Sequence, residues 1–399
     1  MKKLRWPISR GRMILLILVA QGVFSMVYRF AFGLGSCTAL TDRFPWGLWI
    51  AFDVMAGVAL AAGGFVLAGT YYIFNLKQFR PLVKPAVLTA FLGYLMVVFG
   101  LLCDLGRPLV IWHPLVFWQE HSAMFELSIC VSMYTTVLFL EFSPILLEGL
   151  GKRAWAEKMH RAIIPLAILG IVLSTMHQSS LGTLFVLMPY WLHHLWYTPL
   201  LPWFFLLTAL AVGPAMVTVE SYLCARSLRR PFELTLLGRL SRFTRWVLAL
   251  YLGVRCFDLW QRGSLALALV PSLESVAFYL ELTAGVIVPL FLFFWPTTKQ
   301  NTGQLVTANA LVVLGVILNR ANVAVTGLIR TKGDIYVPSL SEFSVTIGLV
   351  ALAILGYSLA MEYLPVLQAL PAAPAQARAA AKAYPWREEP LPSRSGSSS

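Results

Sequence analysis

Residues 85–104 read PAVLTAFLGYLMVVFGLLCD, a run in which only the final residue is charged. About twenty helical residues cross a hydrocarbon core of about 30 Å. Because lipid offers the backbone no hydrogen-bond partner, such a run must be a helix. Similar apolar blocks lie at about 13–32, 47–74, 122–147, 161–178, 199–225, 243–260, 272–296, 305–327 and 341–364. The sequence therefore predicts an all-α integral membrane protein with about ten transmembrane helices.

The composition excludes a soluble protein. Of the 399 residues, 58% are hydrophobic and 12% are charged, whereas soluble domains carry about 25% charged residues. The period-2 alternation of an outer-membrane barrel is absent. A net charge of +13 would suggest nucleic acid in a soluble protein, but in a membrane protein the position of the charge decides its meaning. We therefore expect membrane lipid, and no nucleic acid, as a partner.

The amino terminus resembles a signal peptide, because the basic stretch MKKLRWPISRGR precedes the first apolar block. No small-x-small cleavage site follows, so we interpret 13–32 as an uncleaved first helix. The weakest predicted helix is 243–260, which Arg255 and Asp258 interrupt.

Lysine and arginine are unevenly distributed between the loops. One set of alternate loops, together with both termini, carries Lys2, Lys3, Arg5, Arg10, Arg12, Lys77, Arg80, Lys84, Lys152, Arg153, Lys158, Arg161, Arg226, Arg229, Arg230, Arg239, Arg242, Arg245, Lys299, Arg378, Lys382, Arg387 and Arg394. The opposite loops carry only Arg43, Arg107, Arg262, Arg330 and Lys332. By the positive-inside rule the richer side is cytoplasmic. We predict a multi-pass protein of the bacterial cytoplasmic (inner) membrane with both termini in the cytoplasm.

The chain is expected to contain one polytopic membrane domain, 1–365. The remaining segment, 366–399, is rich in Pro, Ala, Arg and Ser. Such a composition is typical of disorder, so we predict a disordered cytoplasmic tail.

Ionisable groups inside the predicted helices are candidates for function, because each costs about 3 kcal/mol or more at the membrane centre. With odd-numbered helices running outward and even-numbered helices inward, one set falls in the outer third of the membrane. Its members are Asp53, Asp104, Arg107, Glu126, His177, Arg255, Asp258 and Arg320. In this scheme His177 lies at the outer end of its helix and Glu126 about one turn into its helix.

Aromatic and amide groups join this outer layer. Trp46, Trp49 and Asp53 are spaced i, i+3 and i+7, which predicts one helical face, and Gln178 follows His177. A quinone head group needs hydrogen bonds at two carbonyls and a proton source on reduction, which such side chains supply. The pattern therefore favours a quinone site.

Each residue also has a simpler interpretation. Trp46 and Trp49 are compatible with the interfacial aromatic belt. Asp104 and Arg107 are compatible with a helix-end ion pair, and His177 with a satisfied core histidine. The convergence of several such groups at one depth favours a ligand site.

A second set of carboxylates lies deeper or toward the inner side: Glu141, Glu220 and Glu281. Buried carboxylates spaced across a bilayer can relay protons. They can also be structural groups that stay protonated. Both interpretations remain open.

The sequence argues against haem and against a metal site. A b-type haem in a helix bundle usually needs two facing histidines, and of the six histidines only His177 is placed within the membrane. A His121–His177 pair is geometrically conceivable. The five cysteines form no C-x-x-C pair, which argues against an iron–sulfur or zinc site held by this chain alone.

Several motifs resemble the NrfD/PsrC family of membrane quinone subunits, and most of all its HybB branch, the membrane subunit of some uptake nickel–iron hydrogenases. They are GLGSCTALTDRFPWGLWIAFD (33–53), STMHQSSLGTL (174–184), YIFN (72–75), DLGR (104–107), FEL (125–127) and LEFSP (140–144). The resemblance covers most of the first six predicted helices and is thin beyond Arg255. The motifs are fairly specific for the family and less specific for the complex that the subunit serves.

The resemblance implies two four-helix bundles, here about 47–178 and 199–327, with 13–32 and 341–364 as peripheral helices. It implies a menaquinone or ubiquinone site near the periplasmic face, no haem, and docking onto a periplasmic ferredoxin-like iron–sulfur subunit of a hydrogenase or another oxidoreductase. The matching positions place the quinone near Trp46, Trp49, Asp53, Asp104, Arg107, Glu126, His177 and Gln178. Proton movement through membrane carboxylates, proposed for members of this family, would fit Glu220 and Glu141.

The resulting hypothesis gives each group a role. Glu126 or His177 donates a proton, Asp53 orients the quinone, and Arg107 holds a carboxylate or stabilises negative charge. Two other classes remain open: a transporter, which ten helices and buried carboxylates allow but no clear internal repeat supports, and a haem-bearing cytochrome b.

Overall fold

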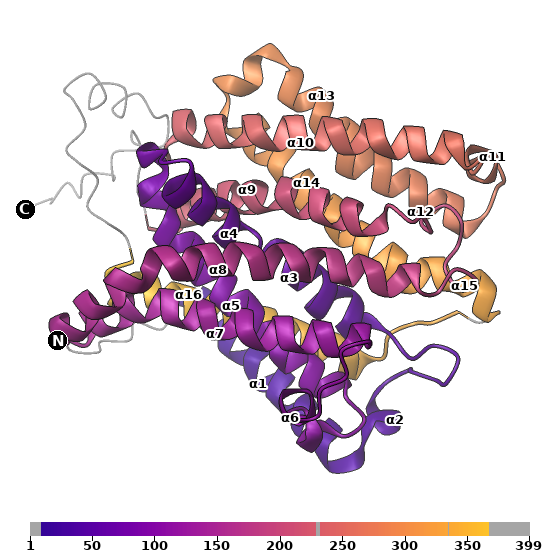
Figure 1. The fold of residues 1–399 in the computed structure, drawn as a ribbon, viewed down its shortest axis with the longest axis horizontal. Coiled ribbons are helices and arrows are strands. Elements are labelled where there is room, and N and C mark those ends of the chain that lie inside the picture. The colour runs from indigo at the N-terminus through magenta and orange to yellow at the C-terminus, as the bar shows by residue number, and fades with distance from the viewer. Residues whose placement is uncertain (1–8, 229–231, 334, 367–399) are drawn as a thin grey trace, which may run out of the picture.

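The computed structural model describes residues 9–228, 232–333 and 335–366. Within these residues the chain forms helices and no strand. Figure 1 shows the long helices lying side by side along one common direction. The predicted all-α membrane fold is thereby confirmed. The predicted tail, 366–399, lies outside the described residues apart from Val366.

Nine helical segments of the described chain are long and apolar enough to cross a membrane. The long helices are α1 (Arg10–Phe32), a composite second span of η1 (Trp49–Ala56), α3 (Gly57–Leu60), α4 (Gly63–Ala68) and η2 (Gly69–Ile73), then α5 (Arg80–Asp104), α7 (Ala123–Gly149), α8 (Arg153–Val186), α9 (Leu201–Ser227), α10 (Leu234–Gln261), α12 (Leu273–Leu282) continued by η5 (Thr283–Ile287) and α13 (Val288–Phe294), α14 (Thr302–Ala321) continued by η7 (Asn322–Thr326) and α15 (Gly327–Lys332), and α16 (Leu340–Tyr363). Short helices α2 (Leu34–Cys37), η3 (Lys77–Phe79), η4 (Pro108–Val110), α6 (His113–Val116), α11 (Leu265–Ala268) and η6 (Pro296–Lys299) lie in the connections.

The helix that completes the predicted set of about ten is α10, which is 28 residues long but more highly charged than the nine apolar segments. Near its C-terminal end lie Arg255 and Asp258, which are 2% and 4% exposed. Both charges therefore face neighbouring helices rather than lipid, and α10 runs beside α9 and α14.

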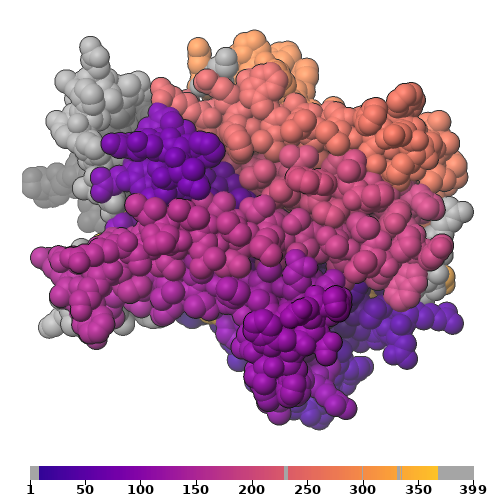
Figure 2. Space-filling view, in the orientation of Figure 1, coloured from indigo at the N-terminus to yellow at the C-terminus, as the bar shows by residue number. Residues whose placement is uncertain are grey.

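Successive long helices run in opposite directions along one common axis, and their ends gather at two opposite faces of the molecule (Figure 1). At the end called here the terminal face, α1 begins and α16 ends. At the opposite face, η1 begins, α5 ends, and the short helices α11 and α15 lie. Figure 2 shows that the segment around α6 projects from the side of the helix bundle.

Among the nine apolar spans of the described chain, the second span is the most buried. Of its apolar stretch, 78% is buried, against 17% in α1, and it contacts α5, α8, α9 and α14. Small residues permit this contact, because a Cβ on Gly63 would lie 2.8 Å from Val217 and one on Gly64 would lie 2.6 Å from Ala90. The second span therefore joins the two halves of the helix array.

The remaining helices pack around this span. α5, α7 and α8 contact one another on one side, and α9, α10, α13 and α14 contact one another on the other. α1 packs along α16, and α16 also contacts α5 and η1. The boundaries of two bundles, 47–178 and 199–327, stay a prediction.

Four segments adopt π-helical rather than α-helical geometry: η1 and η2 in the second span, η5 and η7 in later spans. Single π-turns within α-helices are often found at functional sites. Asp53 lies in η1 and Asn322 in η7. This geometry points to both places as candidates for function.

The helix that carries His177 is much longer than predicted. Instead of 161–178 it is α8, Arg153–Val186. The polar run from Ser174 suggested a helix end, but these side chains form contacts inside the protein, so the helix continues through them. The prediction that His177 lies at the outer end of its helix was therefore wrong.

The closest helix contact suggests a test of this packing. A Cβ on Gly285 of η5 would lie 2.3 Å from the Cα of Gly315 on α14, so Gly285→Val must push these helices apart. Overpacking costs about 1–3 kcal/mol, and we expect the purified protein to melt several degrees lower. Gly253→Val is the control, because a Cβ there meets no atom within 4 Å. Equal melting temperatures for the two variants would contradict the packing.

Candidate functional site

Asp53 is fully buried at the start of the second span. Its Oδ2 accepts a hydrogen bond of 2.7 Å from Thr346 Oγ1 on α16. On its other side, a Cβ on Gly100 of α5 would lie 2.8 Å from the Asp53 Cβ. Asp53 Oδ1 is buried with no partner among the described residues. Asp53 is thus held between α5 and α16 with one acceptor atom left over.

The start of α16 is bonded to the loop before the second span. Trp49 Nε1 donates to the backbone oxygen of Glu342 at 3.2 Å. The buried Glu342 carboxylate accepts from the backbone nitrogens of Ala39 (3.0 Å) and Ser339 (2.8 Å) and from the hydroxyl of Tyr336. Burial, reinforced by the hydrogen bond to Glu342, raises the pKa of Tyr336, so its hydroxyl stays protonated and donates.

Sequence reasoning missed these residues of α16. Ser339 and Glu342 form a capping box, whose spacing is visible in the sequence. Its second role, binding the chain at Ala39, depends on the fold. The helix predicted as peripheral therefore forms one wall around Asp53.

Arg29 of α1 is a further residue that sequence reasoning overlooked. It is 3% exposed, its Nε donates to the backbone oxygen of Cys103 at 2.6 Å, and its Nη2 donates to that of Leu105. A cation is favoured at the carbonyl end of a helix, and α5 ends at Asp104 as predicted. An arginine within an apolar block was a signal that could have been found.

Arg107 and Asp104 do not form the ion pair that their spacing allowed. Arg107 is exposed in the loop after α5, and no ion pair among the described residues joins the two. Asp104 is half-buried, and its Oδ1 has no partner within the described chain.

A second polar group lies deeper, where α8 meets α5 and the second span. Ser174, His177 and Gln178 share one face of α8 and are 0% exposed. His177 Nδ1 lies 3.1 Å from the Tyr94 hydroxyl of α5, and Gln178 Nε2 donates to the Val58 oxygen at 2.9 Å. His177 Nε2 and Gln178 Oε1 are buried without a partner in the described part of the chain.

Aromatic rings enclose this group. The Tyr94 ring meets the Tyr134 ring of α7 edge-on, with centroids 4.5 Å apart, and both tyrosines lie beside Ser174. Tyr94 is 0% exposed. Nothing in the sequence distinguished Tyr94 from other tyrosines of the chain, because its role depends on the helix opposite.

Glu126 lies in the first turn of α7, close to the predicted depth, but its side chain is exposed. It accepts a hydrogen bond from Ser180 Oγ of α8. Ser180 lies one turn beyond His177 on the same helix. Glu126 therefore connects the surface at the opposite face to the neighbourhood of His177.

Trp46 does not share a face with Trp49 and Asp53, as the spacing had predicted. It precedes the helix and packs edge-on against Phe185 of α8, with ring centroids 5.4 Å apart. Trp49 and Asp53 both bond α16 instead. Within the predicted outer layer, Asp53 thus bonds α16, whereas His177 of α8 bonds Tyr94 of α5.

The three carboxylates of the proposed proton path lie in different surroundings. Glu141 is half-buried near Tyr72 and Tyr134, and Glu220 accepts from Thr89 Oγ1 at 2.6 Å. Both belong to the half of the protein near the terminal face.

Glu281, predicted among the deeper or inner groups, lies about two turns into its span from the opposite face. Its carboxylate accepts from Trp196 Nε1 (2.9 Å), Asn319 Nδ2 (2.7 Å) and Asn322 Nδ2 (2.8 Å). Arg320 extends this network to Asn319 and to Thr208 Oγ1. A carboxylate with three donors is already well satisfied.

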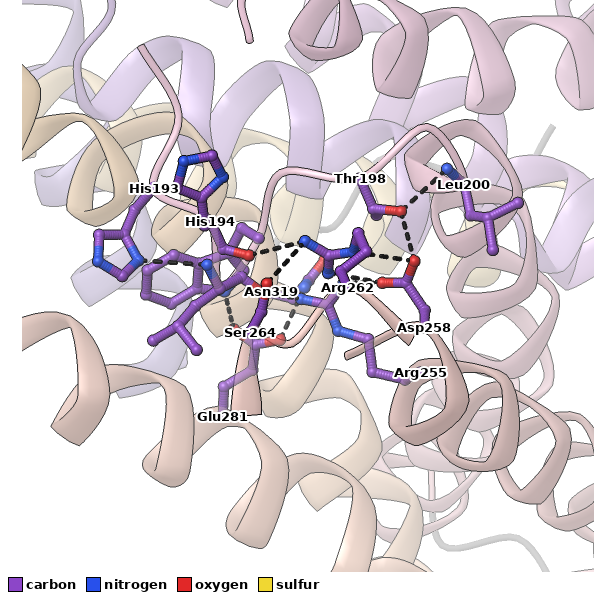
Figure 3. A network of polar contacts seen from close by, with 12 residues as sticks. His193, His194, Thr198, Leu200, Arg255, Asp258, Arg262, Ser264, Glu281 and Asn319 are labelled. Atoms are coloured by element: carbon purple, nitrogen blue, oxygen red, sulfur yellow. Dashed lines mark hydrogen bonds and ion pairs between the residues drawn. The ribbon is translucent and has the colours of Figure 1, made fainter. Parts of the chain in front are cut away.

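Figure 3 shows the adjoining charges at the end of α10. Asp258 accepts from Thr198 Oγ1 at 2.7 Å and from Arg262 Nη2 at 2.6 Å. Arg255 Nη2 donates to the Leu195 oxygen at 2.6 Å. These bonds anchor the loop before α9 to α10. Among the described residues no group of three or more His, Cys, Asp or Glu side chains is placed to hold a metal ion.

These features define a class: a multi-pass membrane protein whose spanning helices enclose hydrogen-bonded, partly unsatisfied polar groups. The chain belongs to the NrfD family, whose model, described as polysulphide reductase NrfD, matches residues 36–332. Membrane subunits of redox complexes belong to this family.

Named relatives cover almost the whole chain. A probable Ni/Fe-hydrogenase 2 b-type cytochrome subunit of Escherichia coli is 33% identical over 91% of this chain and 94% of its own length. The integral membrane subunit of a menaquinone reductase of Nitratidesulfovibrio vulgaris is 29% identical over 86% and 88%. A selenate reductase subunit of Mesobacillus selenatarsenatis is 25% identical over 88% and 93%.

The bond between Asp53 and Thr346 can be tested by Thr346→Val. The change keeps the shape of the side chain and removes the donor, so Asp53 loses its one hydrogen bond. An unsatisfied buried group costs about 1–3 kcal/mol, and we expect a lower melting temperature for the purified protein. Thr136→Val is the matched control, because Thr136 is exposed and bonds only its own helix. Equal stability of the two variants would show that the bond contributes nothing.

Proposed function

We propose that this chain is the quinone-reactive membrane subunit of a respiratory redox complex, passing electrons between an iron–sulfur subunit and a pool of menaquinone or ubiquinone. The observation that carries the proposal is the pair of unpartnered, fully buried atoms His177 Nε2 and Gln178 Oε1. The N. vulgaris relative named as a menaquinone reductase subunit supports the same chemistry.

The protonation of His177 follows from its neighbour. If the Tyr94 hydroxyl donates to Nδ1, then Nε2 carries the ring hydrogen and is a donor for a quinone carbonyl. Gln178 Oε1 is an acceptor, suited to the hydroxyl of a reduced quinone. Together they offer one contact for each redox form of the head group.

Proton supply to this position would begin at Glu126. Its carboxylate is exposed and bonds Ser180, and Ser180 lies one helical turn from His177 on α8, an axial distance of about 5 Å. In this proposal a proton passes from the surface through the Ser180 hydroxyl toward His177, whose Nδ1 takes up a proton as Nε2 gives one to the quinone. Glu126 would be the site of proton exchange and His177 the donor to the quinone.

Asp53 and Trp49 would line the side of the site toward α16, where Asp53 Oδ1 is still free to accept a bond. Trp46, Asp104 and Arg107 lie nearer the opposite face. We assign them to the entrance, where the charge of exposed Arg107 would attract a carboxylate of the partner or stabilise negative charge on the quinone.

The orientation follows from the loop charges. Arg10, Arg12, Lys77, Arg80 and Lys84 lie at or near the terminal face, so we propose that this face is cytoplasmic. The opposite face would then be periplasmic and would receive a ferredoxin-like iron–sulfur subunit. The exposed side chains of Trp112, Phe117 and Trp118 there are of the kind enriched at protein interfaces.

The catalytic partner is best assigned to a hydrogenase, because the E. coli relative with a hydrogenase name is 33% identical. Proton movement across the membrane would use Glu141 and Glu220, which lie near Tyr72 and Tyr357. Glu281 would serve at the opposite half, where three donors hold its carboxylate.

The site assignment is tested by His177→Gln in the intact purified complex. We expect quinone reduction to fall by about 10²-fold or more, as loss of a positioned proton donor usually causes. Activity of the catalytic subunit with an artificial dye should stay unchanged, since the dye bypasses the membrane subunit. Glu126→Gln should reduce quinone turnover in the same assay.

The control is His160→Gln, on the same helix but exposed and paired with Glu148 at 2.8 Å. It should leave both activities as in the unaltered complex. Unchanged quinone turnover in His177→Gln would refute the role of this site, and loss of dye activity would point to disrupted assembly instead.

Haem needs a separate test, because the E. coli relative is named a b-type cytochrome subunit. His177 lacks a facing partner of its own kind: the other histidines of the described chain lie in α6, in loops, or in the first turns of α8. These residues do not fit a bis-histidine haem. We expect the purified subunit, reduced with dithionite, to show no Soret shift and no α or β band. A reduced-minus-oxidised haem spectrum that disappears in His177→Gln would contradict this expectation.

A further inference from the structure

A groove of about 350 Å³ lies on the membrane-facing surface, between α5, α7 and α16. Its lining is apolar and includes Leu88, Phe91, Phe142, Leu359, Tyr363 and Leu364. These residues lie in the half of each helix near the terminal face, and the three labels are neighbours in Figure 1. The groove is therefore separate from the position proposed for the quinone.

Such a groove must be filled by hydrocarbon in the bilayer, because an empty space forfeits the dispersion contacts of its lining. One lining residue needs a hydrogen-bond partner that hydrocarbon cannot supply. The hydroxyl of Tyr363 is buried and has no hydrogen-bond partner within the described chain. An occupant with an oxygen acceptor near the terminal face would satisfy it.

At the end of the groove near the terminal face lies a cation that can accommodate a further hydrogen-bond acceptor. Lys84 lies one turn before Leu88 on α5, and its side chain is 22% exposed. Its Nζ is 3.5 Å from the oxygen of Pro365, the residue after Leu364, and 3.6 Å from Glu148 Oε2. Both contacts are long for hydrogen bonds, so the ammonium group can bind a further acceptor.

A carboxylate lies beside the same mouth. Glu148 precedes Gly149, whose Cβ, if present, would lie 2.6 Å from the Leu364 side chain. The Glu148 side chain is 30% exposed and also bonds His160. The mouth of the groove thus presents one ammonium and one carboxylate, a few ångströms apart, next to the apolar lining.

We propose that this groove is a binding site for phosphatidylethanolamine, a phospholipid whose head group carries both a phosphate and a primary ammonium. One acyl chain occupies the groove between α5, α7 and α16. Lys84 binds the phosphate, Glu148 accepts from the lipid ammonium, and the Tyr363 hydroxyl donates to an ester or phosphate oxygen. A purely anionic head group would match Lys84 alone and would be repelled by Glu148.

The test uses the full chain, purified in mild detergent, stripped of lipid and titrated in native mass spectrometry. The probes are phosphatidylethanolamine, phosphatidylglycerol and phosphatidylcholine with identical acyl chains. We expect phosphatidylethanolamine to bind tightest, since phosphatidylglycerol lacks the ammonium and phosphatidylcholine lacks its N–H donors. Lys84→Ala should weaken phosphatidylethanolamine binding by about tenfold, the effect of one charge-assisted hydrogen bond.

Matched variants separate the head group from the groove. Glu148→Gln should remove the preference for phosphatidylethanolamine over phosphatidylglycerol, whereas Lys77→Ala, an exposed lysine of the same face, should change nothing. Leu359→Trp should block the groove, and Leu352→Trp, an exposed position of α16 outside it, should not. The variants are compared only where their melting temperatures match that of the unaltered protein.

Two results would overturn the proposal. Equal binding of the three lipids, unaffected by Glu148→Gln, would reject the head-group assignment. Unchanged phosphatidylethanolamine binding in Lys84→Ala, or in a folded Leu359→Trp, would reject the groove. Lys84 is partly exposed at the surface, so its variant keeps the test decisive even if Leu359→Trp does not fold.

Discussion

Every polar atom within the hydrocarbon layer needs a hydrogen-bond partner inside the protein, and most features of this structure follow from that constraint. It makes the backbone helical. It also explains why charged side chains of the spans, such as Arg255, Asp258 and Arg320, are turned inward. Where the requirement is met by two helices at once, as at Asp53 and Thr346, it decides which helices lie together.

Some buried polar atoms do not meet this constraint within the described residues, and three of them belong to the proposed quinone site. His177 Nε2, Gln178 Oε1 and Asp53 Oδ1 are buried beside well-bonded neighbours, yet have no partner in the described chain. Leaving them so costs free energy, and a bound head group would recover it. By contrast Glu281 has three donors, which suits a structural carboxylate or a proton-transfer group better than a quinone contact.

The two outermost helices are less peripheral than their exposure suggests. α1 is the least buried of the nine apolar spans, yet its Arg29 binds the end of α5, and α16 supplies Thr346 and Glu342 to the neighbourhood of Asp53. α16 also forms a wall of the groove proposed to bind lipid, near the other face. One helix thus lines both the proposed quinone site and the proposed lipid groove.

The sequence by itself determined the helical membrane fold, the number of spans, the alternation of basic loops and the family, because apolar runs, charge counts and motifs are local in the chain. It also placed Asp104 at a helix end and Arg255, Asp258 and Arg320 toward the opposite face. An arginine at position 29 was within its reach and was overlooked. Only the tertiary structure decided that His177 lies well inside α8, that Glu126 is exposed, that Trp46 meets Phe185, and that Tyr94 and Thr346 are partners of the candidate site. Those facts depend on which helices become neighbours. Hydropathy reports only the preference of each residue for an apolar environment over water, so it carries no information about which helix packs against that residue.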